Sequence, residues 1–228
     1  MKKTLLAATL AAAVSGAFAA DVTLYGVADV GLRYTNTKTD GVPTDKLEMM
    51  SGHNAGSRFG LKGSEDLGNG WKAGFQLEGQ YLVDTGALKN AKFFHRLATV
   101  SISGPLGTVY AGRMGTLSSA AGPADLIFAA GDAFDGGDNL IYALSVESRR
   151  DNTLLYVTPA AGGLQGYLQY SFQGSGQENV QSSLNERYMG AGLRWKAGAF
   201  ESALAVEHVR YAAAADDVKG ALDDKLAV

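Results

Sequence analysis

The stretch Ser57–Gly79, SRFGLKGSEDLGNGWKAGFQLEG, decides the fold class. In its first half apolar and basic side chains alternate, which puts Phe59 and Leu61 on one face of an extended chain. Arg58 and Lys62 fall on the opposite face. The glycine-rich DLGNG segment that follows has the composition of a tight turn. Alternation with a period of two on both sides of a turn predicts an antiparallel hairpin that is apolar on one face and polar on the other.

The same alternation continues along the chain. After the turn, the strand Trp71–Tyr81 sets one group of positions against another, namely Ala73, Phe75, Leu77 and Gly79 against Lys72, Gln76, Glu78 and Gln80. Nine strands and the start of a tenth are predicted in all, at Asp21–Thr35, Ser57–Ser64, Trp71–Tyr81, His95–Ser103, Thr108–Arg113, Asn152–Thr158, Leu164–Phe172, Arg187–Trp195, Phe200–Tyr211 and from Asp223 onward. Tilted strands of about 9 to 11 residues cross a bilayer, and several of these segments are that long.

The connections between the strands alternate between short turns and long polar segments. The short ones are Asp66–Gly70, Gly104–Gly107, Pro159–Gly163 and Ala197–Ala199. The long ones are Asn36–Gly56, Leu82–Ala91, Met114–Asp151, Gln173–Glu186 and Ala212–Asp223. Outer-membrane barrels have short turns on one rim and long loops on the other, and a closed barrel leaves no unpaired backbone edge in lipid. We therefore predict an all-β fold, a transmembrane antiparallel β-barrel.

The composition excludes several other classes of protein. The 228-residue chain has 20 Lys and Arg against 23 Asp and Glu, so it lacks the basic excess of a nucleic-acid-binding protein. It contains no Cys, which excludes disulfides and thiolate metal sites. Its His residues are not at metal-ligand spacing and no hydrolase or zinc-protease motif occurs, so we expect no enzyme, no cofactor and no metal. No apolar run of about 18 to 20 residues follows the N-terminus, so we expect no transmembrane helix.

The first twenty residues have the features of a signal peptide. Lys2 and Lys3 form a basic start, Thr4–Val14 is an apolar run, and Ala17-Phe18-Ala19 is a small-residue cleavage signal. The alternative is an N-terminal core helix. We predict a signal peptide over residues 1–20, export to the bacterial outer membrane, and a barrel domain over residues 21–228.

The third long connection, Met114–Asp151, is too long for a simple link, because loops beyond about 12 to 15 residues are usually functional or disordered. It is rich in Ala and Gly, contains Phe128 and Phe134, and carries the acidic residues Asp125, Asp132, Asp135 and Asp138. Folded into the lumen of a barrel, this loop would narrow the pore. Its carboxylates would then face basic residues of the wall, and opposed charges make a transverse field that selects solutes.

The acidic residues of this loop have two other interpretations. Asp132 and Asp135 lie beside glycines and fit ordinary turns. The run DAFDGGDN also suggests a Ca²⁺ loop, but it lacks the alternating acids and terminal Glu of an EF-hand.

Several motifs occur together in one order along the chain: DVTLYGVADVGLRY, SRFGLKGSEDLGNGWKAGFQLEG, VSISGPLGTVYAGRMG, FDGGDN and RRDNTLLYVTPAAGGLQGYLQYSF. With them the chain resembles, over its whole length, the general porins of Gram-negative bacteria, of the trimeric, sixteen-stranded kind found in beta-proteobacteria. The resemblance implies a homotrimer in contact with outer-membrane lipid, with water-filled channels through which ions and small hydrophilic solutes diffuse passively. It also implies a constriction where basic residues of the wall face acids of the inward-folding third loop.

The family's motifs assign the basic side of this constriction. Arg58 falls in SRFGLKG, Arg113 in the AGR that ends a strand, and Arg149 in the stretch that enters the next strand. Further candidates for the basic wall are Arg96, Lys62 and Arg150. Arginines on the wall with loop acids that match the family poorly predict weak anion selectivity.

Three of these assignments depend on local detail. Simple alternation puts Arg96 on the Val100 face, so a loop or bulge must turn it inward. Arg58 and Lys62 are alternatively ordinary lumen-facing side chains in water. Where related porins carry an acid just before the Phe of the loop, this chain has Ala133.

The chain departs from the family at its end. Porins of this kind are longer and end in an aromatic residue, whereas this sequence stops at Leu226-Ala227-Val228. One interpretation is a C-terminally truncated porin that does not conduct; another is a genuine barrel of about ten strands, which would leave little lumen. A third alternative, of a different class, is a secreted soluble β-sandwich that binds carbohydrate. In a barrel the positions Leu24, Val30, Phe59, Phe75 and Leu77 would face lipid, and in a sandwich they would form a closed core.

Overall fold

The computed structural model describes residues 21–39, 41–119, 122–124, 126, 149–174, 185–211 and 225–227. The predicted signal peptide, residues 1–20, lies outside them, as do the loop acids Asp125, Asp132, Asp135 and Asp138. Within the described ranges no helix is long and apolar enough to cross a membrane.

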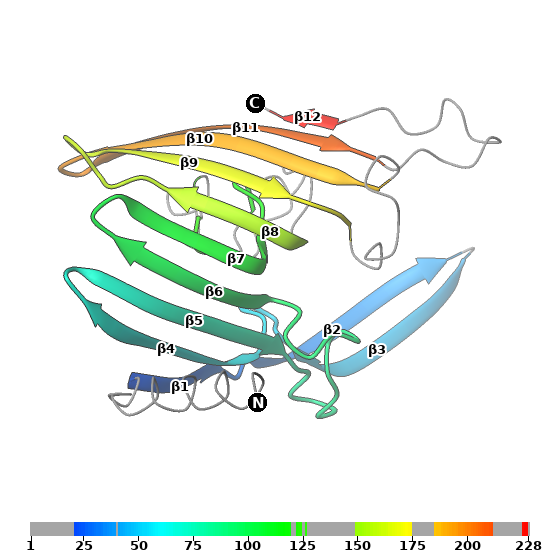
Figure 1. Ribbon diagram of the computed structural model, residues 1–228. Coiled ribbons are helices and arrows are strands. Elements are labelled where there is room, and N and C mark those ends of the chain that lie inside the picture. Colours follow the sequence, from blue (N-terminus) through cyan, green and yellow to red (C-terminus); the bar gives the residue numbers. More distant parts are fainter. Residues whose placement is uncertain are drawn as a thin grey trace.

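The described residues form β-strands. Their bounds are β1 Asp21–Val27, β2 Val30–Thr39, β3 Val42–Ser51, β4 Arg58–Gly68, β5 Trp71–Gln80, β6 Leu97–Gly104, β7 Gly107–Gly115, β8 Arg149–Val157, β9 Leu164–Ser171, β10 Arg187–Ala197, β11 Phe200–Arg210 and β12 Lys225–Ala227. Ten of them make one antiparallel sheet in the order β1-β4-β5-β6-β7-β8-β9-β10-β11-β12. Figure 1 shows this sheet as one curved layer with β1 and β12 at its two ends. The all-β antiparallel fold is confirmed.

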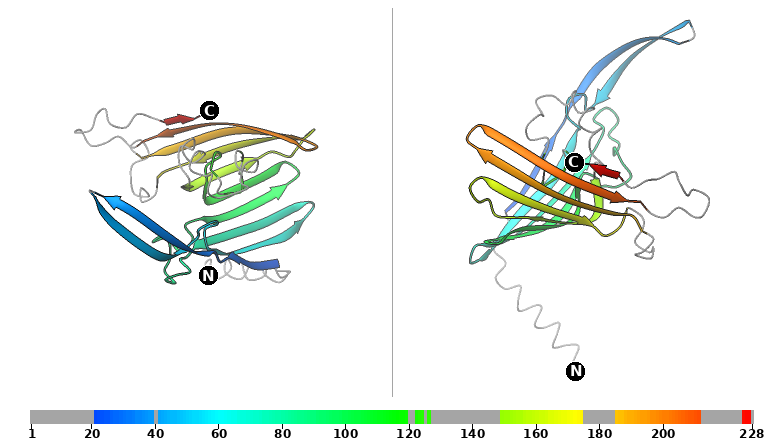
Figure 2. Two further views of the ribbon diagram at one scale, coloured as in Figure 1. Left: turned by 180° about the vertical axis from the view of Figure 1, so that it is seen from behind. Right: turned by 90° about the horizontal axis from the view of Figure 1, so that it is seen from above.

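The structure corrects the prediction at the first strand and the first long connection. Asp21–Thr35, predicted as one strand, is interrupted between β1 and β2, and Asn36–Gly56, predicted as a loop, contains β3. β2 and β3 form a separate hairpin that projects from the curved layer (Figures 1 and 2).

Asp29 is the physical reason for the interruption. Its carboxylate accepts hydrogen bonds from the backbone NH groups of His53, Asn54 and Ala55, at 2.8, 3.2 and 2.9 Å. Its carbonyl accepts a further bond, at 2.9 Å, from the NH of Gly52. These bonds hold a short loop against the chain between β1 and β2, so the pairing partner changes from β4 to β3 there.

The ten-stranded sheet has two chemically different faces. One row of paired residues crosses β1, β4, β5 and β6 as Leu24, Leu61, Leu77 and Ala98. The neighbouring row runs as Thr23, Lys62, Gln76 and Thr99. We call the face of the first row the apolar face and that of the second the polar face.

The apolar face has no protein cover among the described residues. Leu24 is 72% exposed, and Val100 and Leu168 are 60% and 58% exposed. A soluble sandwich would bury such side chains between two sheets, whereas the described strands form one sheet and one hairpin. The sandwich alternative therefore does not describe this chain.

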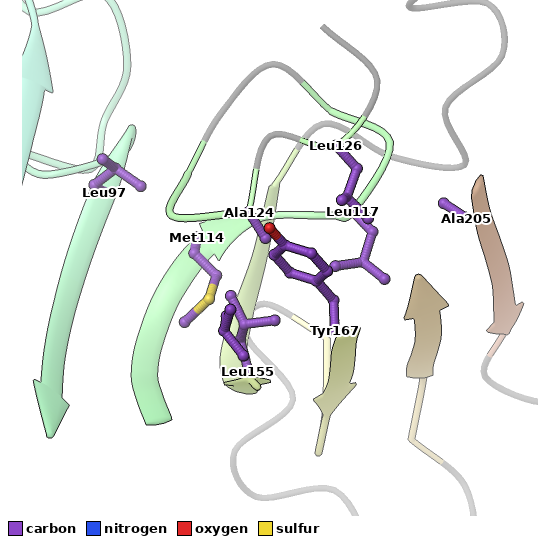
Figure 3. Packing of buried hydrophobic residues seen from close by; sticks show 9 residues of the cluster. Leu97, Met114, Leu117, Ala124, Leu126, Leu155, Tyr167 and Ala205 are labelled. Atoms are coloured by element: carbon purple, nitrogen blue, oxygen red, sulfur yellow. The ribbon is translucent and has the colours of Figure 1, made fainter. Parts of the chain in front are cut away.

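The core of the molecule lies on the polar face of the later strands. Buried apolar residues from β6, β7, β8, β9 and β11 meet residues of the loop that follows β7, and the cluster comprises Leu97, Met114, Leu117, Ala124, Leu126, Leu155, Val157, Tyr167 and Ala205. Figure 3 shows Leu117 and Leu126 beside Tyr167. We call residues 116–119, 122–124 and 126 the loop start; it packs against the polar face of the sheet.

Candidate functional site

Arg96 lies on the polar face because of a bulge before β6. Leu97 is paired with Glu78, and the NH of Arg96 also donates to the Glu78 carbonyl at 3.1 Å. Two residues thus oppose one, which turns the Arg96 side chain out of simple alternation. Its Nε donates to Glu78 Oε1 at 2.5 Å, and Nη1 donates to Gln80 Oε1 at 3.3 Å. The Arg96 side chain thus lies on the same face as Glu78 and Gln80 and not on the Val100 face.

Glu78 is the centre of this charged row. Tyr25 donates its hydroxyl to Glu78 Oε2 at 2.9 Å, and Gln76 Nε2 donates to the Tyr25 hydroxyl at 2.8 Å. Lys62 Nζ lies 5.5 Å from the centroid of the Tyr25 ring, a cation–π contact. Polar side chains of β1, β4 and β5 thus form one connected network across the polar face.

Arg58 lies at the loop end of the same face. Val27 and Gln80 are its strand partners, and its Nη1 donates to the Gly56 carbonyl at 3.1 Å. The structure therefore brings Arg58, Lys62 and Arg96 together on one face, which we call the basic wall. Sequence alternation gave the side of Arg58 and Lys62 correctly.

Arg113 lies on the other side of the sheet by its register. It is paired with Ala98, which continues the apolar row of Leu24, Leu61 and Leu77. Its Nε donates to the His95 carbonyl at 2.6 Å, and its Nη1 forms an ion pair with Asp151 Oδ1 at 2.6 Å. Asp151 also pairs with Lys92. Arg113 is therefore tied to the strand end and does not join the basic wall.

Arg149 and Arg150 differ in environment although they are neighbours. Arg149 lies opposite Gly115, and its Nε donates to the Arg96 carbonyl at 3.1 Å. Arg150 is 3% exposed, pairs with Glu186, and its Cζ lies 6.0 Å from the Tyr188 ring centroid. The charge of Arg150 is thus compensated by Glu186 inside the protein.

His95 lies among these arginines and is 5% exposed. Burial, followed by the charges of Arg149, Arg96 and Arg113, lowers the pKa of His95 from 6.5 to about 4. The imidazole is therefore neutral at pH 7, and the positive charge at this end of the strands is that of the guanidinium groups.

A second polar network holds the loop start against β10 and β11. The NH of Leu117 donates to the Tyr188 hydroxyl at 3.2 Å, and the NH of Ser118 donates to Glu207 Oε1 at 3.0 Å. The Ser118 hydroxyl bonds the other oxygen of Glu207, and the Tyr188 hydroxyl donates to Glu207 Oε1 at 2.6 Å. We call Leu117, Ser118, Tyr188 and Glu207 the loop anchor.

Two glycines of β10 make room for this contact. A Cβ on Gly190 would lie 3.0 Å from Leu117 Cδ1, and a Cβ on Gly192 would lie 2.4 Å from Leu126 Cδ1. Sequence reasoning did not identify the loop anchor. The signal was available only as Glu207 among the apolar residues of Phe200–Tyr211, which alternation alone does not interpret.

A model of the Gram-negative porin family matches residues 7–226 of the chain. The chain belongs to the Gram-negative porin family. The resemblance inferred from the motifs is thereby confirmed, and so is the bacterial outer membrane as its location.

The curated relatives of this porin come from beta-proteobacteria. An outer membrane porin protein of Bordetella pertussis is 33% identical over an alignment of 236 positions. The alignment covers 92% of this chain and 60% of the relative. The outer membrane porin protein 32 of Delftia acidovorans is 33% identical over 210 residues, covering 90% of this chain and 59% of the relative. This porin thus spans about 60% of the length of the curated relatives it matches.

Solved porin structures share the fold. The anion-selective porin from Comamonas acidovorans superposes with a TM-score of 0.64 at 29% identity, covering 85% of this chain and 58% of that one. The Salmonella typhi OmpF complex with daunomycin superposes with a TM-score of 0.60 at 19% identity, covering 90% of this chain and 59% of that one. The curved sheet of this porin therefore corresponds to part of a porin barrel wall.

Proposed function

We propose that this porin forms the wall of a water-filled channel through which ions and small hydrophilic solutes diffuse passively across the outer membrane. The observation that carries the proposal is the division of one sheet into an exposed apolar face and a charged polar face. Lipid-facing and lumen-facing side chains alternate along each strand of such barrels. The apolar face then contacts outer-membrane lipid, and the basic wall lines the water.

Closure of the barrel is part of this proposal. In the described residues β1 and β12 are the end strands of the sheet, and an unpaired strand edge in lipid leaves backbone groups unsatisfied. The resemblance implies a sixteen-stranded barrel, in which further strands pair these edges, and a homotrimer.

The third loop is proposed to narrow the channel. The loop start already lies on the polar face, with Leu117 and Leu126 buried against β10. Asp125 falls within the loop start in the sequence, and Asp132, Asp135 and Asp138 come after it. These loop acids are proposed to face the basic wall.

We further propose a weak preference for anions. Arg58, Lys62 and Arg96 share one face, while Glu78 offsets part of the charge of Arg96. Cation pathways are typically lined by acids and anion pathways by Arg and Lys. A solved neighbour at 29% identity is described as anion-selective, which supports the same direction.

Reversal potentials in planar bilayers under a KCl gradient test the selectivity. The chain should show an anion preference, and the double variant Arg58→Gln/Lys62→Gln should lower it by roughly twofold or more because two lumen charges are lost. Arg113→Gln is the matched control, since Arg113 lies on the apolar side and should leave the ratio unchanged. A cation preference of the unmodified channel would contradict the anion-selective role of the basic wall. So would an equal change of the anion preference in the double variant and in Arg113→Gln. Absence of any conductance would favour the non-conducting alternative.

A further inference from the structure

Glu207 is a carboxylate in an unusual place. It is 1% exposed on the polar face of β11, where a water-filled lumen would leave a carboxylate hydrated. Three hydrogen bonds replace that water: two from Ser118 and one from Tyr188. Two of the three donors therefore belong to the loop rather than to the wall.

Tyr188 extends the contact by one residue. Its hydroxyl donates to Glu207 Oε1 at 2.6 Å, the shorter of its two side-chain contacts. A lone pair of the same oxygen accepts the NH of Leu117 at 3.2 Å. Gln169, whose Oε1 lies 3.0 Å from the Tyr188 hydroxyl, donates its Nε2 to the Gly115 carbonyl at 2.8 Å. The carbonyl of Gly115 and the NH groups of Leu117 and Ser118 are thus held by three side chains of the wall.

Apolar packing fixes the direction in which the loop leaves this point. Leu117 and Leu126 are 0% and 2% exposed, and the NH of Leu126 donates to the Leu117 carbonyl at 3.4 Å. Both side chains lie over Gly190 and Gly192, where any larger residue would displace them. The loop start is therefore clamped at a polar point and at an apolar point on neighbouring strands.

We propose that Glu207, with Tyr188, is a positioning residue for the channel: it latches the start of the third loop to the wall. The inference rests on the proposed channel, because the position of the loop matters for conduction only if solutes pass it. The latch itself is a property of the folded chain and can be measured without conduction.

Limited proteolysis of the folded, detergent-solubilised chain tests the latch. Chymotrypsin cleaves after Leu, so cleavage after Leu117 and Leu126, identified by mass spectrometry, reports release of the loop start. Glu207→Gln keeps the shape of the side chain but removes its charge, and it should accelerate this cleavage by at least about tenfold, since hydrogen bonds to charged groups are the strong ones. Glu201→Gln is the matched control. Glu201 lies on the same face of β11 and pairs with Arg194, away from the loop start, so its loss should leave the cleavage rate unchanged.

Two further variants keep the test decisive if Glu207→Gln does not fold. Ser118→Ala removes a bond to Glu207 from the loop side and leaves the wall intact, and it should accelerate cleavage by at least about threefold. Tyr188→Phe removes the hydroxyl that bonds both Glu207 and the NH of Leu117, and it should also accelerate cleavage by at least about threefold. Equal cleavage in the wild type and in these loop-anchor variants would overturn the latch.

Single-channel recording separates the latch from the channel. If the wild type conducts, Glu207→Gln should raise the noise of the open-channel current while Glu201→Gln leaves it unchanged; unchanged noise in Glu207→Gln would overturn the positioning role. If the wild type does not conduct but Glu207→Gln accelerates cleavage, the latch stands and the proposed channel fails for this chain.

Discussion

At the scale of single residues, His95 shows how the arginines act together. Its pKa is lowered from 6.5 to about 4, so the unfolded chain takes up a proton before the folded chain does. Stability should therefore fall as the pH drops from about 6.5 toward 4, by at most about 3 kcal/mol from this residue. His95→Gln should remove this part of the pH dependence. Urea unfolding in detergent at pH 7 and pH 4.5 measures it, and identical pH dependence in the wild type and the variant would contradict the assigned environment.

Asp29 provides a second prediction at this scale. Backbone hydrogen bonds, the strongest from Ala55, hold the pKa of Asp29 below its usual value. Its contribution is therefore present above the normal pKa of Asp and is lost as the pH falls through the lowered value. At pH 7, Asp29→Asn should reduce the hydrogen-exchange protection of the His53, Asn54 and Ala55 amides. The Gly52 amide, which bonds the Asp29 carbonyl, is an internal control. Equal loss at all four amides would indicate general unfolding instead.

Sequence alternation identified the face of Arg58 and Lys62, and it showed that Arg96 needs a bulge. It could not identify the side of Arg113, because that depends on which residue of β6 lies opposite, and register is a long-range property. The same limit hid the ion pair with Asp151, whose partner is 38 residues away.

At the scale of elements, β10 serves as a seat for the loop start. Gly192→Val should force Leu126 out of its place, because a Cβ there would lie 2.4 Å from Leu126 Cδ1. Overpacking of this kind costs about 1 to 3 kcal/mol. Adding Leu126→Ala should recover a large part of that loss. A double-mutant cycle on thermal stability measures the coupling, and strictly additive effects would show that the two side chains do not meet.

The strands themselves were largely predictable, since the period-two pattern and the short turns identified every strand of the ten-stranded sheet. The missed element was β3, because VPTDKLEMMS contains Pro and charged residues that weaken a strand prediction. The Asp-Gly dipeptide at positions 40 and 41 was an overlooked hairpin signal, and Gly41 has a φ of +84°. The buried polar face of β8–β11 was also missed, because alternation does not show that a loop covers it.

At the scale of the whole molecule, neighbouring strands of the sheet from β4 to β12 are consecutive in sequence. The sheet can therefore extend hairpin by hairpin, with the apolar face toward lipid and the basic wall and loop anchor on the other side. The core lies between loop and wall on one half of the polar face, and the charged network occupies the other half. This division leaves the basic wall as the part of the described sheet suited to line an aqueous path.

We expect one face of this sheet to meet lipid and the other to meet water. Because the chain has no Cys, single cysteines can be introduced along β5 at Gln76 and Leu77 and along β4 at Lys62 and Leu61, and the protein reconstituted in liposomes. A water-soluble maleimide should label Gln76→Cys and Lys62→Cys, whose side chains lie on the polar face. A nitroxide-labelled lipid should quench fluorophores attached to Leu77→Cys and Leu61→Cys, whose side chains lie on the apolar face. Equal aqueous labelling at all four positions, or quenching without alternation along the strands, would contradict this expectation.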